Sequence, residues 1–355
     1  MRAESAPRAR PADASSSNTS EYLAGKVSVS LFLMESTSGS SEDWDATQEG
    51  QVYAEAIEAV QAVAQLYPGS ERQFVLHARY GGTDPRVRVA CEPIAHAARS
   101  NDGSGSHEDA WTRTILAGFG STANDMWTAS RNFADTVRGA DRTDRALNVF
   151  VAHSRADADG VFPDGRFGYA WLGGPHIVKT YDNDGWGIDR SNEVLRPEMH
   201  HSFFALDEYS SSNGSCTATS GYFAAPNDDC QRTCLRNVPC VLVANSNSSC
   251  AATHAQVATT DTDDDGTADI LETAPAVAAT VSVAPGNGTP AWITGTPTVG
   301  IPPNQNPYYR GSGNAISCSR SPASSTASTA IRGRRRASPR ATVSSTPTRR
   351  GTRST

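Results

Sequence analysis

The sequence lacks features that mark several common classes of protein. No stretch reaches the roughly 18 to 20 apolar residues that a membrane-spanning helix needs, so we expect no membrane span. Residues 1–22 contain no apolar run of the kind that forms a secretory signal. An overall excess of positive charge is also missing, because the 355 residues carry a formal net charge of −7.

Charge is distributed unevenly along the chain. Residues 319–355 hold nine arginines and no acidic residue, which leaves 22 basic against 38 acidic residues in the rest. A body with a net charge near −16 repels nucleic acid and anionic membranes, and it suits cation binding. We therefore expect no nucleic-acid partner.

Cysteine is concentrated in one segment. Five of the seven cysteines lie between Cys216 and Cys250, a density that favours disulfides in an oxidising compartment. The alternative is a structural zinc site, because Cys230 and Cys234 have a spacing that suits two thiolate ligands. We favour disulfides and an extracellular location, with a signal that is removed or not visible.

Hydrophobic periodicity predicts an α/β (α+β) domain. Residues 1–24 have few large apolar groups and predict a disordered lead-in. Strand patterns follow at 26–35, 72–80 and 146–154, and apolar residues spaced three and four apart predict helices at 46–67, around Trp111 and around Phe133. We expect this twisted-sheet domain to cover residues 25–260.

Residues 165–182 offer two short strand-like runs interrupted by Gly173, Gly174 and Pro175. Glycine and proline suit the edge of a sheet better than its centre, so this segment predicts an edge strand. His153 and His176 lie on predicted strands, where an ordinary buried histidine is the simpler interpretation.

The segment with the strongest chemical signal is PEMHHSFFALDEY, residues 197–209. A zinc peptidase uses two histidines one helical turn apart, with a glutamate after the first that takes a proton from the metal-bound water. Here Glu198 and His201 occupy the glutamate and second-histidine positions, but Pro197 stands where the first histidine belongs.

Together with Asp207-Glu208-Tyr209, this segment resembles the HExxHxxxxxDEY motif of secreted bacterial metzincin-like zinc peptidases of the immune inhibitor A type. The surrounding FPDGRFGYAWLGGPHIVKTYDNDGWG and GYFAAPNDDCQ are also similar. The resemblance implies a catalytic Glu198, zinc ligands His201 and Asp207, and Glu208 as an alternative ligand. It further implies that the segment containing Gly173, Gly174 and His176 binds an extended polypeptide substrate by strand pairing.

Departures from the family pattern put the activity in doubt. Pro197 has no lone pair for zinc, and inside a helix it costs about 3 kcal/mol, so we expect the helix to start there or to be damaged. Phe204 replaces the usual turn glycine, and the helix must break between about 203 and 206 for Asp207 or Glu208 to reach the metal. His200 points about 100° away from His201 on a helix, so it does not replace the lost ligand without unwinding. No methionine follows Met199, and Leu242 is our candidate for the place of the methionine turn.

A second motif, residues 261–272, has the spacing of a calcium loop. Oxygen donors at positions 1, 3, 5, 9 and 12 surround a glycine at position 6. The expected ligands are Asp261, Asp263, Asp265, the Thr267 carbonyl, Asp269 and Glu272. The alternative is an acidic solvated linker; we favour calcium in a structural role.

The C-terminal part changes character twice. Residues 273–318 predict the first strands of a truncated β-sandwich-like segment. Residues 319–355 predict a disordered tail, which is either a natural basic tail or the product of a frameshift near Cys318.

Three hypotheses follow for a chain that we expect to be a monomer. The first is an extracellular zinc-dependent endopeptidase that is impaired by Pro197. The second is a calcium-stabilised, non-catalytic relative that binds a protein ligand. The third, a calcium module unrelated to proteolysis, does not account for the motif at 197–209.

Overall fold

The computed structural model describes residues 15–37, 39, 42–67, 72–99, 107–271 and 304–308, together with the backbone of 275–282 and 292–299. The chain divides into two compact units. The larger unit contains residues 1–274 and 300–321, and the smaller contains residues 275–299 and 322–355. None of the described helices is long and apolar enough to span a membrane.

The strands are β1 (Lys26–Ser36), β2 (Gln73–Tyr80), β3 (Arg88–Val89), β4 (Arg145–Ala152), β5 (Gly168–Ala170), β6 (His176–Thr180), β7 (Thr219–Ser220), β8 (Ala225–Pro226), β9 (Pro275–Ser282) and β10 (Trp292–Val299). The helices are α1 (Ala46–Leu66), α2 (His107–Gly118), α3 (Met126–Asp141), α4 (Ser191–Ser202), α5 (Gln231–Cys234), α6 (Val241–Ala244) and α7 (Ala251–Gln256), with short 3-10 helices at Pro85–Val87, Pro93–Ala95, Ile188–Arg190 and Asp269–Leu271.

The larger unit is built on a mostly parallel sheet with the strand order β2-β1-β4-β6-β5, to which β3 adds beside the end of β1. Every pairing in this sheet is parallel except that of β5, which runs antiparallel to β6. The expected α/β architecture is therefore confirmed at this level, and β5 is the edge strand that the glycine-rich segment predicts.

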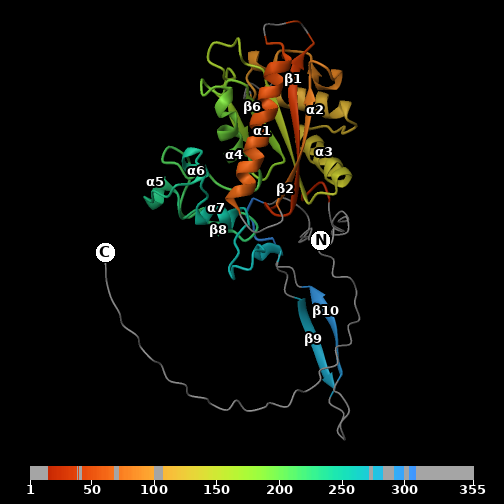
Figure 1. Cartoon of the computed structure of the whole chain (residues 1–355), viewed down its shortest axis with the longest axis vertical. Coiled ribbons are helices and arrows are strands. Elements are labelled where there is room, and N and C mark those ends of the chain that lie inside the picture. Colours follow the sequence, from red (N-terminus) through yellow and green to blue (C-terminus); the bar gives the residue numbers. More distant parts are fainter. Residues whose placement is uncertain are drawn as a thin grey trace, which may run out of the picture. The chain divides into compact units, whose positions relative to one another are not determined.

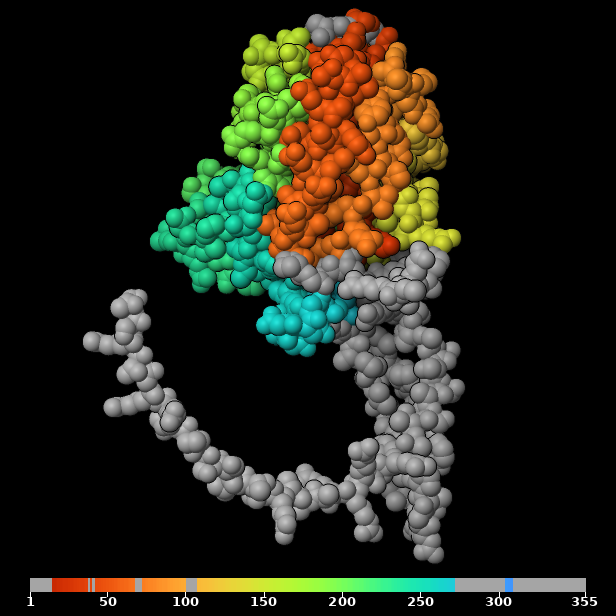
Figure 2. All heavy atoms as spheres, in the orientation of Figure 1, coloured from red at the N-terminus to blue at the C-terminus, as the bar shows by residue number. Residues whose placement is uncertain are grey.

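Alternating residues of the buried strands face two separate cores. Val29 and Leu31 of β1 pack with α1 and α4 on one face, whereas Phe32 packs with α2 and α3 on the other. A parallel sheet covered on both faces explains why its strands are apolar almost throughout. Figure 1 shows α1 and α4 in one layer, and Figure 2 shows α1 at the surface beside the segment that carries α5 to α7.

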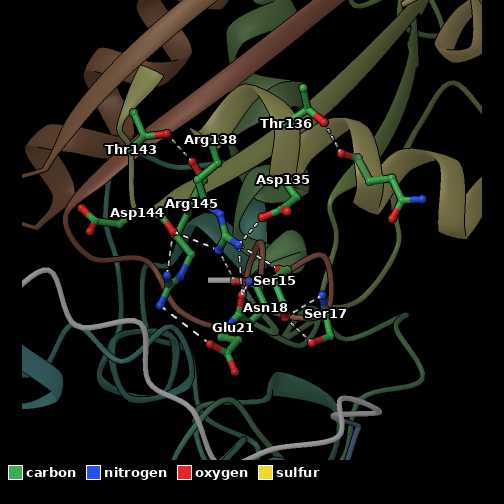
Figure 3. A network of polar contacts seen from close by, with 11 residues as sticks. Ser15, Ser17, Asn18, Glu21, Asp135, Thr136, Arg138, Thr143, Asp144 and Arg145 are labelled. Atoms are coloured by element: carbon green, nitrogen blue, oxygen red, sulfur yellow. Dashed lines mark hydrogen bonds and ion pairs between the residues drawn. The ribbon is translucent and has the colours of Figure 1, made fainter. Parts of the chain in front are cut away.

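Residues 15–24 differ from the expected disordered lead-in, because the stretch from Asn18 to Ala24 is buried. Tyr22, Leu23 and Ala24 pack in hydrophobic clusters, and polar contacts hold the residues before them (Figure 3). Arg138 of α3 donates to the carbonyl oxygens of Ser15 and Asn18, both at 2.8 Å. The Arg145 guanidinium lies 3.8 Å above the Tyr22 ring. Such partners offset the cost of burying polar groups, which a hydrophobicity pattern does not reveal.

In the smaller unit β9 and β10 form an antiparallel pair in which Pro275 lies opposite Val299. The β-sandwich-like interpretation of 273–318 expects strands in this region, and the sandwich itself stays a prediction. The turn between β9 and β10 lies outside the described residues. Residues 304–308 belong instead to the larger unit, where the Gln305 amide donates to the Tyr222 carbonyl at 2.8 Å. The expected tail at 319–355 also lies outside the described residues.

Candidate active site

The helix that carries Glu198 and His201 begins earlier than expected. α4 starts at Ser191 and has Pro197 inside it, so the expectation of a helix that starts at Pro197 is wrong. Pro197 cannot donate to the carbonyl four residues before it, a loss of about 3 kcal/mol. Tertiary contacts offset this loss, since Val194 and Leu195 are buried and the Asn192 side chain donates to Glu55 of α1 at 2.7 Å.

The end of α4 turns the chain back towards the helix. α4 ends at Ser202, as the motif requires, and Phe204 adopts a left-handed conformation with φ of 73°. This is the conformation that a glycine supplies more easily. As a result, Asp207 returns to His201, whose Nε2 lies 3.1 Å from Asp207 Oδ1.

The His201 imidazole is held in the way that a metal ligand usually is. Its Nδ1–H donates to the Ala205 carbonyl at 2.7 Å, which leaves Nε2 facing Asp207. Two donors on a tetrahedral zinc ion lie about 3.3 Å apart, because each bond is about 2.0 Å long. The observed 3.1 Å between Nε2 and Oδ1 fits two zinc ligands. The Pro197 side chain offers no third donor.

Burial and neighbouring charges perturb the ionisation of this group. Burial raises the pKa of Glu198 to about 7; Asp207 acts in the same direction, whereas His201 and the Ala170 amide oppose it. Burial alone lowers the pKa of His201, but Asp207 and Glu198 outweigh burial and raise it to about 9. Without a metal, His201 is therefore a cation at neutral pH, and Glu198 exchanges its proton near pH 7.

Two other residues of the motif, His200 and Glu208, point away from the His201–Asp207 pair. His200 is buried, and its Nε2 lies 2.6 Å from the Tyr67 hydroxyl, so it does not face His201. Burial lowers the pKa of His200 to about 4, and it is neutral at ordinary pH. Glu208, the alternative ligand, accepts hydrogen bonds from Cys250 and Thr253 in the interior. The structure brings neither side chain to the His201–Asp207 pair.

The edge strand β5 lies against α4, but through residues other than those expected. The Ala170 amide donates to the Glu198 carboxylate, and a Cβ on Gly168 would meet Val194 at 2.7 Å. The segment supplies the edge strand as expected, but Gly173 and Gly174 lie after β5 and His176 lies on β6, so none of the three is on the outer edge of β5.

Those three residues use their polar groups internally. The Gly173 amide donates to the His201 carbonyl at 2.9 Å, and the Gly174 amide donates to the Trp171 carbonyl. His176 is buried on β6 between β4 and β5, with Nε2 2.9 Å from Glu108. His153 is likewise buried, with its two ring nitrogens against Glu42 and Gln48. Both histidines are structural, as the simpler interpretation predicts.

Tyr209 belongs to the surroundings of this group, although its role is not evident from the motif alone. Its side chain is 39 % exposed, and burial together with Asp207 and Glu198 raises the pKa of its phenol. Leu242, the candidate for the methionine turn, is buried with Met199 and accepts the Glu208 amide on its carbonyl at 3.1 Å. It therefore lies beside the chain that carries Asp207.

The cysteine-rich segment contains one disulfide among the described residues, Cys216–Cys234. This confirms the disulfide interpretation for that pair, and it removes Cys234 from the alternative zinc site with Cys230. Cys91, Cys230, Cys240 and Cys250 are free thiols.

The acidic loop folds around Asp261. Its carboxylate accepts the amides of Asp265 at 3.2 Å and Gly266 at 2.8 Å, and Gly266 has φ of 89°. Ligand oxygens of Asp261, Asp263 and Asp265 lie within 4.8 Å of one another. Asp269 instead accepts from Thr260 and Thr262. Glu272 lies outside the described residues.

Compared with protein-family models and with curated proteins, the chain matches none. The group formed by Glu198, His201 and Asp207 beside β5 therefore rests on its own geometry and chemistry.

Proposed function

We propose that this chain is an extracellular endopeptidase of the zinc-dependent, metzincin-like type, in which the loss of a ligand at Pro197 impairs catalysis. The observation that carries this proposal is the convergence of His201 Nε2 and Asp207 Oδ1 at 3.1 Å, beside the half-buried Glu198. His201 and Asp207 would hold zinc beside Glu198, whose carboxylate could accept a proton from the attacking water.

Each residue of the candidate site has a separate role in the proposed peptide hydrolysis. His201 and Asp207 would hold zinc, which when bound polarises the scissile carbonyl and the attacking water. Glu198 takes the water's proton and delivers it to the leaving amine, and the Ala170 amide orients its carboxylate. The outer edge of β5, which has no strand partner among the described residues, pairs with an extended polypeptide beside α4.

A second candidate is a non-catalytic relative that binds a protein ligand in the same place. The observation that favours it is the charge balance of the group: with a pKa of about 9, His201 is a cation that pairs with Asp207 without any metal. The charges of His201 and Asp207 then balance each other, and the edge of β5 binds a protein ligand without cleaving it.

Zinc content and casein cleavage distinguish these candidates. We expect Pro197→His to hold zinc stoichiometrically and to cleave casein, whereas Pro197→Ala, which removes the proline but adds no ligand, does neither. Pro197→His with Glu198→Gln should keep zinc and lose cleavage, and adding His201→Gln to Pro197→His should lose the zinc gained. If Pro197→His binds no more zinc than the native chain, the peptidase proposal fails.

The loop at 261–271 supports a structural calcium ion in this proposal, because its carboxylates and the Thr267 carbonyl are the hard oxygen ligands that calcium prefers. We expect calcium to raise the melting temperature of the native chain but not that of Asp261→Asn with Asp263→Asn. An equal rise in both proteins would leave the loop as an acidic linker.

A further inference from the structure

A group of three metal-ligating side chains lies away from Glu198 and His201, near the start of α2. Cys91 follows β3, His96 follows the 3-10 helix Pro93–Ala95, and His107 is the first residue of α2. One ligand atom from each lies within 4.8 Å of the others. All three residues are partly buried, so an ion from solvent can reach them.

The contacts within the group are specific. Cys91 Sγ lies 4.0 Å from His107 Nδ1, and the His96 and His107 rings stack with their centroids 4.1 Å apart. Two donors on a tetrahedral zinc ion lie about 3.6 Å apart for sulfur and nitrogen and about 3.3 Å apart for two nitrogens. Small rotations of partly exposed side chains are enough to close these gaps and to tilt the stacked rings towards one ion.

Rigid elements position the three side chains. β3 pairs with the end of β1, and the 3-10 helix Pro93–Ala95 is anchored by its buried residues Pro93 and Ile94. The Glu108 amide donates to the Ala98 carbonyl at 3.2 Å, which ties the start of α2 to the segment that carries His96. Preorganisation of this kind lowers the cost of assembling a metal site.

We propose that Cys91, His96 and His107 form a binding site for a thiophilic divalent transition metal, of which Zn²⁺ suits the ligands best. One thiolate and two imidazoles are soft to borderline ligands that select such ions over calcium or magnesium. Three protein ligands leave the fourth position of the ion open to solvent. The ion joins the segment after β3 to the first turn of α2.

Apart from the His201–Asp207 pair, two other groups of potential ligands in the described residues have different chemistry. Cys240 and Cys250 are buried, with sulfur atoms 2.7 Å apart, whereas two thiolates on one zinc ion lie about 3.8 Å apart. Asp261, Asp263 and Asp265 offer oxygen alone and suit calcium. A thiolate signature that depends on Cys91 therefore identifies the proposed ion.

Cobalt(II), which absorbs light when a thiolate binds it, tests the proposal in the full-length protein with the Cys216–Cys234 disulfide intact. We expect the native chain to show a thiolate-to-cobalt charge-transfer band that zinc abolishes. Cys91→Ser should remove the band, and His96→Gln and His107→Gln should each weaken cobalt binding by about tenfold or more. His201→Gln should leave the band unchanged, which separates this site from the proposed peptidase centre, and so should Cys240→Ser with Cys250→Ser.

A band that persists in Cys91→Ser overturns the proposal, as does the absence of a band from native protein in which a thiol assay shows Cys91 to be reduced. Circular dichroism of each variant shows whether it is folded. Because a serine variant that unfolds would also lose the band, the two histidine variants provide a second measurement. Unchanged cobalt affinity in both of them contradicts the proposal.

Discussion

Two groups of charged side chains in the larger unit differ in their burial and in their hydrogen-bonding and ionic partners. Arg138 and Arg145 have fully buried side chains, and each has acidic or carbonyl partners from the segment before β1. His201 and Asp207 form a pair in which Nε2 lies 3.1 Å from Oδ1 and the carboxylate is 41 % exposed. The first group holds the N-terminal segment to the sheet, whereas the second combines a raised pKa at His201 with a carboxylate that solvent reaches.

The difference indicates where chemistry is possible. A buried cation that is fully paired has no capacity for a substrate or an ion, although removing it leaves several groups without partners. A half-exposed pair contributes little to stability because water screens it, so its geometry is free to serve binding. Stability and ionisation measurements on matched variants test this contrast.

The largest effect is expected from Arg138→Ala. Arg138 donates to the carbonyl oxygens of Ser15, Asn18 and Asp144 and to the Asp135 carboxylate, so its loss leaves buried acceptors unsatisfied. We expect the free energy of unfolding to fall by about 4 kcal/mol, as is typical when one member of a buried charged network is removed. Urea denaturation measures this change. Arg113→Ala, which removes an exposed ion pair with Asp109, is the control and should cost less than about 1 kcal/mol. Equal effects in the two variants would contradict the contrast.

An effect of similar size that depends on pH is expected at Lys179, a buried lysine whose Nζ donates to the Ser191 hydroxyl and the Thr180 carbonyl. Burial lowers its pKa from 10.5 to about 7, and Glu55 only partly opposes this shift. The unfolded chain binds this proton more tightly than the folded chain does. Stability should therefore rise with pH between about 7 and 10.5, with a slope of at most about 1.4 kcal/mol per pH unit.

Urea denaturation of the native chain and of Lys179→Met across this pH range isolates the contribution of Lys179. The methionine variant should lack the rise, because it has no proton to lose. Parallel curves for the two proteins would show that Lys179 is not buried as a neutral amine.

Much of the larger unit was predictable because its elements obey simple periods. β1 alternates between two cores, and α1 repeats its apolar residues every three or four positions. Residues 15–24 carry no such pattern. Their order depends in part on contacts with Arg138 and Arg145, which lie in a distant part of the chain. Pairing between polar residues more than 100 positions apart is invisible to local sequence analysis.

In the candidate active site too, some features were predictable from the sequence and others depended on tertiary contacts. The turn after α4 and the return of Asp207 to His201 agree with the spacing of the motif, which requires the helix to end before Asp207 if both residues are to bind one ion. The start of α4 did not follow, since Pro197 suggested a helix terminus and the packing on α1 overrode it. Cys91, His96 and His107 have no familiar spacing, so only the fold brings them together.

The smallest effect on stability is expected from Asp207→Asn, which tests the half-exposed pair directly. In metal-free protein the pKa of His201 should fall from about 9, because the asparagine amide no longer balances the imidazolium charge. NMR titration of the His201 ring measures this shift. The control is Asp164→Asn, which removes the ion pair between Asp164 and Arg166, distant in sequence from His201, and should leave the His201 pKa unchanged.

The same pair sets the direction of a pH effect on folding. A folded-state pKa raised above that of the unfolded chain stabilises the protein fully below about pH 6.5, and this contribution is lost as the pH rises through about 9. Because Asp207 is 41 % exposed, we expect the difference in unfolding free energy between native and Asp207→Asn protein to be about 1 kcal/mol or less at pH 6. A loss as large as that of Arg138→Ala would place this pair with the structural network rather than with a site that is open to a ligand.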